Sequence, residues 1–325
     1  MMATAAGYLR WIRDRWRMNG FDQARDQAAV MILLFHGLFR NSREVTGGPC
    51  DPQQGITVAF FSEFVESLLA GGAVIRELDD AVRRPQPGLT AVITFDDGYF
   101  NNVHALDVLQ RFGISATFFI STKHVEEQKA FWWDALYRHA KKRGVSAREI
   151  RQRVRALKHL RAEEIESRIV QWFGAGALTP VSDWDRPFST SELTDFARSQ
   201  YVFLGNHTSD HGILPNYDPE GVRDQILDAQ RFITRISGSA PTSIAYPNGN
   251  YDAQVLQIAR SAGLEIGLTV RTGLNVAARQ DAMELRRLTV WGVPGARRQG
   301  RVLGSMAATE RPGDGSGWLR HPARP

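Results

Sequence analysis

Short apolar segments alternate with longer segments of helical periodicity along most of the chain. Seven of the short segments have the length and composition of strands, at residues 30–35, 91–95, 115–120, 201–204, 242–246, 265–270 and 285–290. Helical periodicity is clearest at residues 60–70, 101–112, 219–236 and 253–262. Strands that alternate with helices are typical of a parallel α/β fold, and seven of them favour a barrel over an open sheet.

One segment interrupts this alternation. From about residue 133 to about residue 180 the pattern is helical and strongly charged, which predicts a helical insertion within one α/β domain of residues 30–296. Its clustered basic residues are Lys141, Lys142, Arg143, Arg148, Arg151, Arg153 and Arg155. We interpret them as a solvated helix face, and the alternative is contact with an anionic substrate group such as a phosphate.

The two ends of the chain follow other patterns. Residues 1–29 are expected to be an amphipathic helical segment with Leu9, Ile12 and Trp16 on one face. Such a helix either packs on the domain or lies on an anionic membrane surface. After Val293 the chain is rich in Gly, Arg and Pro, and we expect a disordered tail over residues 297–325.

The composition of the 325 residues narrows the class of protein. Hydrophobic residues make up 43%, enough for a large core, and a formal charge of +5 without a recognition motif predicts no nucleic-acid partner. Cys50 is the only cysteine and can form no internal disulfide. Because no apolar stretch suits a signal peptide or a spanning helix, we expect a cytoplasmic protein, with peripheral membrane contact through residues 1–29 as an option. The sequence does not indicate an oligomeric state.

Two adjacent carboxylates follow one of the predicted strands. The segment AVITFDDGYF ends a β-rich run in Asp96 and Asp97, and Gly98 permits a tight turn before the next helix. The two side chains project in different directions, so one can bind a cation while the other faces water or substrate. Active sites of β/α barrels collect at this end of the strands, although an ordinary helix cap would also explain the pair.

A pair of histidines follows another predicted strand. In GNHTSDHGIL, His207 and His211 are four residues apart, a spacing that puts both imidazoles on one face of a helical turn. Imidazole and carboxylate are common zinc ligands, and two histidines with one aspartate leave coordination positions open for water and substrate. A structural zinc site would be expected to have a fourth protein ligand. The combination with the aspartate pair therefore predicts a catalytic metal site.

A third segment, SIAYPNGNYD, follows a further strand and should reach the same face of the fold. Its proline fixes the backbone, and exposed N–H groups after it could receive an oxyanion. We therefore expect Tyr246, Pro247 and Asn248 to contact substrate, while a plain turn is the alternative.

The motifs TFDDGY, HTSDH and YPNG, in this order, resemble the NodB-homology domain of the polysaccharide deacetylases (carbohydrate esterase family 4). MILLFHGL and ELRRLTV resemble further segments of the biofilm-polysaccharide branch, so the similarity extends over about residues 30–290. The resemblance implies a distorted (β/α)7 barrel and one divalent metal ion, for which we expect zinc, with cobalt, nickel or manganese as alternatives. It also implies Asp97, His207 and His211 as metal ligands and Asp96 as general base.

The chain departs from the family pattern at two places. Many members have an arginine two residues before the loop proline, where this chain has Ala245. Arg287 or Arg286 is expected to replace it, and Arg287 is also placed among the substrate-binding residues. The segment LRRLTVWGV lacks the late histidine that serves much of the family as general acid, and His36 is expected to take this role. The alternatives are a histidine that merely caps a strand, or His104 or His124 as the acid.

These features predict a hydrolase that removes N-acetyl groups from an amino sugar, with metal-activated water as nucleophile and Asp96 as base. The expected partner is an N-acetylated carbohydrate, either an oligosaccharide, a lipid-linked sugar or a polysaccharide. The alternatives are a deformylase or another amidohydrolase on the same scaffold, and a catalytically weak carbohydrate-binding homologue. The intact Asp-Asp-His-His set argues against a binding module, which has no need of a carboxylate beside three ligands.

Overall fold

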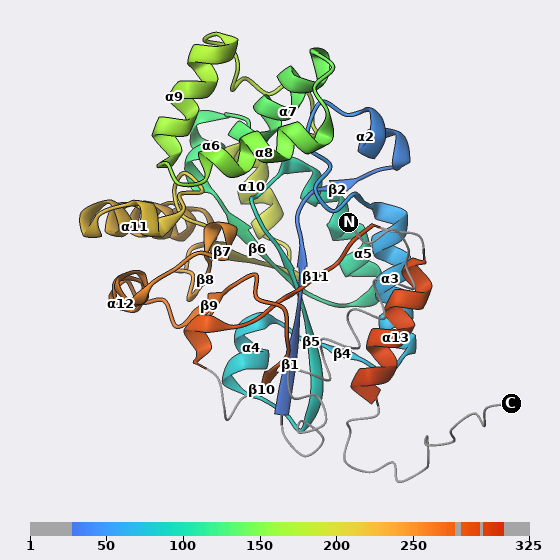
Figure 1. The fold of residues 1–325 in the computed structure, drawn as a ribbon. Coiled ribbons are helices and arrows are strands. Elements are labelled where there is room, and N and C mark those ends of the chain that lie inside the picture. The colour runs from blue at the N-terminus through green and yellow to red at the C-terminus, as the bar shows by residue number, and fades with distance from the viewer. Residues whose placement is uncertain (1–27, 277–280, 293–294, 309–325) are drawn as a thin grey trace, which may run out of the picture.

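Seven parallel strands form the distorted (β/α)7 barrel that the sequence predicted (Figure 1). The structure is a computed structural model that describes residues 28–276, 281–292 and 295–308. In chain order the seven strands are β1 (Ala28–Phe35), β5 (Gly88–Phe95), β6 (Ala116–Ile120), β7 (Val202–Asn206), β8 (Ser243–Ala245), β9 (Ile266–Leu268) and β11 (Leu288–Thr289). The segment of residues 1–29, predicted to be helical, lies outside the described residues except for Ala28 and Ala29, which begin β1.

The order of the strands explains the distortion. The sheet runs β1-β5-β6-β7-β8-β9, and β11 pairs in parallel with the other edge of β1. No named strand pair joins β9 to β11 among the described residues. A parallel bridge between Leu268 and Leu285 links β9 to the segment that leads into β11, with backbone hydrogen bonds from Leu285 to Gly267 and from Thr269 to Leu285, each at 2.8 Å. Two short strands, β4 (Val74–Ile75) and β10 (Asn275–Val276), pair with β5 and β1, while β2 (Leu38–Phe39) and β3 (Ile56–Thr57) form a separate sheet.

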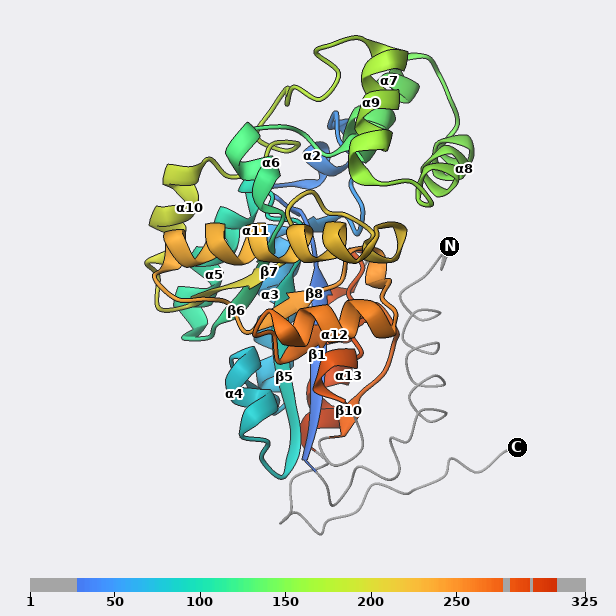
Figure 2. The same ribbon diagram turned by 90° about the vertical axis from the view of Figure 1, so that its left-hand side faces the viewer.

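Helices surround the barrel, as Figures 1 and 2 show. They are α2 (Ser42–Gly47), α3 (Val58–Ala70), α4 (Leu78–Arg83), α5 (Ala105–Phe112), α6 (Thr122–Glu127), α10 (Thr190–Ala197), α11 (Pro219–Ser237), α12 (Ala253–Ser261) and α13 (Ala296–Ala308). The short 3-10 helices are η2 (Phe100–His104), η3 (Leu214–Asn216), η4 (Pro247–Gly249) and η5 (Ala282–Glu284). No described helix has the length and apolar character that crossing a membrane requires.

The alternation of side chains along β1 separates two parts of the core. Met31, Leu33 and Phe35 belong to the large cluster that the outer helices cover. Val30 and Ile32 belong to a second cluster, which joins side chains from strands around the barrel. Because successive side chains of a strand point to opposite faces, a strand that is buried on both faces must be apolar throughout, as β1 is.

The predicted insertion lies between β6 and β7 and consists of α7 (Trp132–Lys142), α8 (Ala147–Leu157) and α9 (Ala162–Phe173). In both views these helices stand together at one end of the barrel (Figures 1 and 2). They share a small apolar core that includes Leu136, Leu157 and Ile169. The insertion therefore forms a helical wall above the ends of the strands.

The prediction of a disordered tail from residue 297 was wrong for its first part, because the helix α13 extends from Ala296 to Ala308. In this helix Gln299 and Leu303 are buried. A Cβ atom on Gly300 would lie 2.4 Å from the carbonyl oxygen of Phe64 in α3, so the glycine permits a close approach of the two helices. In the sequence, the same glycine was part of the Gly-rich pattern that predicted a disordered tail. Residues 309–325 lie outside the described part of the chain.

Candidate metal and catalytic site

The residues singled out from the sequence lie where strands of the barrel end. His36 directly follows β1, Asp96 and Asp97 follow β5, and His207 follows β7. These strands are parallel, so their carboxyl ends face the same side of the barrel. This is the side on which active sites of β/α barrels are built.

Asp97, His207 and His211 bring three metal-ligand atoms together. The Oδ1 atom of Asp97 lies 3.3 Å from Nε2 of His207 and 3.4 Å from Nε2 of His211. All three ligand atoms lie within 4.8 Å of one another. Asp97 Oδ1 is buried and accepts no hydrogen bond within the described part of the chain, an arrangement that is costly without a partner. One carboxylate and two imidazoles in this geometry fit a divalent cation.

The two histidines meet through an irregular loop, so the prediction of a helical turn was wrong in its geometry. Residues 207–211 are not helical, and Thr208 and His211 adopt left-handed φ angles of 63° and 52°. Side chains with a Cβ atom rarely adopt this conformation, and it persists only where the surroundings hold it. The hydroxyl of Thr208 helps to do so by accepting a hydrogen bond from the N–H of Gly212 at 3.0 Å.

The orientation of His207 is fixed by a second hydrogen bond. Its Nδ1 atom lies 2.7 Å from the carbonyl oxygen of Ala245. Because a carbonyl oxygen only accepts, Nδ1 must carry the hydrogen, and Nε2 presents its lone pair beside Asp97. Histidines that bind metals are commonly held in this way, since the bond selects both the tautomer and the plane of the ring.

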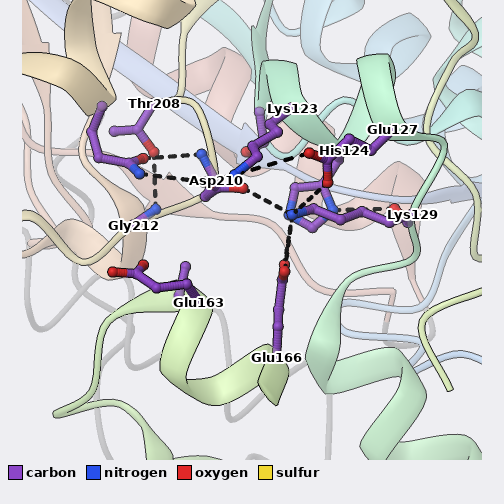
Figure 3. Close-up of polar contacts among 12 residues, drawn as sticks. Lys123, His124, Glu127, Lys129, Glu163, Glu166, Thr208, Asp210 and Gly212 are labelled. Carbon is purple, nitrogen blue, oxygen red and sulfur yellow. Dashed lines mark hydrogen bonds and ion pairs between the residues drawn. The ribbon is translucent and has the colours of Figure 1, made fainter. Parts of the chain in front are cut away.

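An ionic cluster contacts the histidine loop at Asp210 (Figure 3). Asp210, which lies between the two histidines in sequence, accepts hydrogen bonds from Lys129 at 2.9 Å and from Lys123 at 3.1 Å. Lys129 also donates to Glu166 of α9 at 3.0 Å. Burial alone lowers the pKa of Lys129, but Asp210 and Glu166 raise it above its ordinary value. The cluster therefore ties the histidine loop to the insertion.

Asp96 forms a bidentate ion pair with Arg287. The guanidinium nitrogens Nη1 and Nη2 donate to Oδ1 and Oδ2 of Asp96, each at 2.7 Å, and Nε donates to the carbonyl oxygen of Thr269 at 2.9 Å. Arg287 thus provides the cationic partner that Ala245 cannot. Its side chain has no exposed surface. The prediction that Arg287 binds substrate is therefore corrected, because its charge is enclosed against Asp96.

The electrostatics of the site keep both aspartates ionised. Burial raises the pKa of Asp96, but Arg287 and His207 outweigh burial and hold this pKa below its ordinary value. Burial also raises the pKa of Asp97, and the imidazoles of His36 and His207 hold it well below its ordinary value. Asp96 is therefore available as a proton acceptor near neutral pH.

Two glutamines of the loop before β3 contact the site and were not singled out from the sequence. The amide nitrogen of Gln54 donates to the carbonyl oxygen of Leu34 at 2.9 Å, which turns its Oε1 atom toward Nδ1 of His36 at 3.1 Å. His36 therefore donates from Nδ1. Gln53 donates to Oδ2 of Asp97 at 3.1 Å and leaves Oδ1 for the cation. Two glutamines in a loop form no motif, so the sequence offered only their position shortly after the first strand.

Only one of the three residues predicted in the loop after β8 reaches the cavity. Tyr246 is fully buried and donates to the carbonyl oxygen of Met283 at 3.0 Å, and Pro247 is buried as well. Their assignment to substrate binding is corrected, because their side chains belong to the core. Asn248 has a left-handed φ of 57°, lines the cavity and accepts a hydrogen bond from Lys158.

A cavity of about 210 Å³ opens beside the ligands. The residues of its polar side are His36, Asp51, Gln53, Asp97, His211 and Asn248. The insertion provides the other side, mostly from apolar side chains: Trp132, Trp133, Val154, Leu160, Ala162 and Ile165. The two sides meet where the rings of Trp133 and His211 pack edge to face with centroids 4.7 Å apart.

The sequence matches the family model of the polysaccharide deacetylases over residues 83–267. This region is more than half of the chain and includes the aspartate pair, both histidines and the loop after β8. The chain belongs to the polysaccharide deacetylase family, as its motifs indicated.

Individual relatives are distant. The polysaccharide deacetylase homologue YxkH of Bacillus subtilis (strain 168) is 22% identical over 193 residues, which are 59% of this chain and 48% of YxkH. The chain thus matches about half the length of that relative. The deacetylase PplD of Streptococcus pyogenes, solved in complex with acetate, is 17% identical with a TM-score of 0.59, covering 86% of this chain and 99% of PplD. IcaB from Ammonifex degensii is also 17% identical, with a TM-score of 0.55 and coverage of 86% and 98%. These two likenesses show a shared fold.

Proposed function

We propose that the chain is a metal-dependent hydrolase that removes N-acetyl groups from an amino sugar. The observation that carries the proposal is the buried Oδ1 atom of Asp97, which accepts no hydrogen bond from any described residue and lies beside two imidazole nitrogens at the wall of a cavity. A second aspartate and a third histidine lie at the same edge of the barrel. Membership of the polysaccharide deacetylase family supports this chemistry and the carbohydrate substrate.

Asp97, His207 and His211 would hold one divalent ion, and their donor set suits zinc, with cobalt, nickel or manganese as alternatives. When bound, such an ion polarises an acyl carbonyl and makes water more acidic. Three protein ligands leave room for both. Gln53 and Ala245 hold two of the ligand side chains in place, which limits the reorganisation that binding requires.

Asp96 is the proposed general base. Arg287 fixes the plane of its carboxylate and keeps it ionised, yet each oxygen retains a further lone pair for a proton. The base can therefore accept a proton from the attacking water while the bidentate pair stays intact. Removal of such a base typically costs about 10² to 10⁴ in rate.

His36 is the proposed general acid. Gln54 accepts the hydrogen bond from its Nδ1 atom, so the proton that reaches the leaving amine must come from Nε2. The ring lines the same cavity as Asp97 and His211, on the side of the barrel where β1 ends. The backbone N–H of Asn248 is the proposed donor to the oxyanion.

The test compares the wild type with Asp96→Asn and His207→Ala. Acetate release from N-acetylated oligosaccharides and from N-acetylated glycolipids is assayed, and bound metal is measured by elemental mass spectrometry. We expect Asp96→Asn to keep its metal and lose most activity, and His207→Ala to lose both. Equal activity of Asp96→Asn and the wild type would show that Asp96 is not the general base.

A further inference from the structure

The apolar side of the cavity is larger than the acetyl group of a sugar needs. Trp132, Trp133 and Ile165 are buried there, while Val154 and Leu160 stay half-exposed. An aromatic ring can stack on the C–H face of a sugar, but aliphatic side chains leave sugar hydroxyls without hydrogen-bond partners. A single methyl group would cover only a part of this surface. The wall therefore fits a substrate with an extended apolar portion.

The ammonium group of Lys158 lies where the apolar side of the cavity meets the polar side. Lys158 follows α8 and lines the cavity together with Leu160 and Asn248. Its Nζ atom donates to the side-chain oxygen of Asn248, a neutral partner, and within the described part of the chain no carboxylate forms an ion pair with it. Burial and the neighbouring Arg155 lower the pKa of Lys158, and together they outweigh the charge of Asp97, which raises it.

We propose that this site takes an N-acetyl amino sugar that is joined through a phosphate to an apolar chain. The acetamido group lies at Asp97 and His211, the phosphate lies against Lys158, and the first part of the chain covers Val154 and Leu160. The inference rests on the proposed function, because it assigns the substrate of the same site. The phosphate supplies the counter-charge of Lys158, and the chain removes the exposed part of the apolar wall from water.

Other substrates of this site match only part of these observations. A neutral oligosaccharide offers no charge to Lys158 and no partner for the aliphatic side chains. A sugar with a long N-acyl group would cover the apolar wall but would leave Lys158 without an anion. The two substrates therefore serve as comparisons in the experiment.

The experiment measures kcat and KM of the metal-loaded full-length protein on four soluble probes. They are N-acetylglucosamine linked to decyl phosphate, the neutral decyl glycoside of N-acetylglucosamine, chitotetraose, and N-octanoylglucosamine. We expect kcat/KM for the decyl phosphate probe to exceed that for each other probe about tenfold or more, as one charge-assisted contact can supply.

Two variants assign the effect to the residues. Lys158→Gln is expected to raise KM about tenfold for the decyl phosphate probe and to raise KM for the neutral decyl glycoside much less. Leu160→Ser is expected to weaken both decyl probes and not chitotetraose. Arg151→Gln removes an exposed charge of α8 that does not line the cavity, and it is the matched control that should change nothing. Metal content and thermal unfolding show that each variant is folded.

The outcomes separate the two proposals. If chitotetraose or N-octanoylglucosamine is hydrolysed as efficiently as the decyl phosphate probe, the inference is overturned while the proposed function stands. The same holds if Lys158→Gln affects charged and neutral decyl probes equally. If the wild type releases no acyl group from any of the four probes, both the inference and the proposed function fall.

Discussion

The edge of the barrel and the helical insertion build opposite sides of one cavity in different ways. At the barrel edge, four of the side chains assigned to the chemistry are held by a second polar group: Asp96 by Arg287, Asp97 by Gln53, His207 by the carbonyl oxygen of Ala245, and His36 by Gln54. On the insertion, the side chains that face the cavity are mostly apolar and are held by packing. The difference suggests that the barrel fixes the reaction and that the insertion selects the substrate.

The two regions contact each other through the cluster of Asp210, Lys129 and Glu166 (Figure 3) and through the packing of Trp133 against His211. Asp210 belongs to the loop of the metal ligands, and Glu166 belongs to α9 of the insertion. A change in the buried ion pair of Asp96 and Arg287 at the barrel edge should alter chemistry and local stability together. A change in the insertion should alter substrate range, and it should reach the histidine loop only through these two contacts.

The largest effect is expected for Arg287→Met. The variant leaves Asp96 as a buried carboxylate without its partner, and such a loss typically costs about 3–5 kcal/mol of unfolding free energy. Activity should also fall at least 10²-fold, because an unpaired buried carboxyl tends to be protonated and cannot act as a base. Urea unfolding and acetate release measure the two effects. Arg286→Met, at the half-buried neighbouring position, is the control and should cost less than about 0.5 kcal/mol. Equal stability of the two variants would mean that the ion pair does not hold the barrel edge together.

A second effect at the barrel edge should be confined to catalysis. His36→Ala is expected to lower kcat about 10²- to 10⁴-fold and to leave the metal content and the unfolding free energy nearly unchanged. His159→Ala, which removes an exposed histidine next to Lys158, is the matched control and should keep kcat within about twofold. Steady-state kinetics with the proposed substrate decide the matter. A His36→Ala variant with the kcat of the wild type would show that His36 is not the general acid.

How far the sequence predicts this site depends on where each residue stands in the chain. Asp96, Asp97 and His207 directly follow strands, and the parallel arrangement of those strands brings them together. Arg287 is distant in sequence from Asp96, and nothing in the local pattern distinguishes it from Arg286 as the partner. The left-handed loop at His211 could not be foreseen either, because its conformation is held by Thr208 and by surrounding groups.

The apolar wall was missed for a different physical reason. The charged residues of the insertion predicted a solvated helix face. Trp133 and Ile165 line the cavity, but their positions in the helical pattern are also typical of residues in an ordinary core. The orientation of a packed helix depends on its neighbours, so periodicity alone cannot separate a cavity wall from a core. The helix α13 was missed in the same way, since the contact that stabilises it lies on α3.

The contact between the two regions should have an intermediate effect. Lys129→Met removes a nearly buried ammonium that Asp210 and Glu166 share, and about 3 kcal/mol of unfolding free energy is expected to be lost. Lys123→Met removes the other partner of Asp210, but the Lys123 side chain is 40% exposed and should contribute about 1 kcal/mol at most. Urea unfolding of both variants tests this order. A smaller loss for Lys129→Met than for Lys123→Met would show that the cluster does not join the insertion to the histidine loop.

The smallest effect concerns His124 of α6, which differs from His207 and His211 because it contacts no carboxylate within the described part of the chain. It is buried, stacks on Phe131 with ring centroids 4.1 Å apart, and contacts the carbonyl oxygen of Lys129 through Nδ1 at 3.1 Å. Burial, with a contribution from the Lys129 charge, lowers the pKa of His124 from 6.5 to about 3. Between pH 6.5 and 3 the unfolded chain therefore binds a proton at this residue that the folded chain does not, so stability falls as the pH falls.

At pH 5 this difference amounts to about 2 kcal/mol relative to pH 7, since one pKa unit corresponds to about 1.4 kcal/mol. His124→Asn keeps an N–H group near the carbonyl oxygen of Lys129 but cannot take up the proton. The variant should be less stable than the wild type at pH 7, because it loses the stacked ring, and this disadvantage should shrink by about 2 kcal/mol at pH 5. Urea unfolding of both proteins at the two pH values gives the difference directly, and every other titrating group contributes equally to the two proteins. If the gap between them does not change with pH, then His124 takes up its proton in the folded state, and the insertion side of the molecule would be more open to water than its packing indicates.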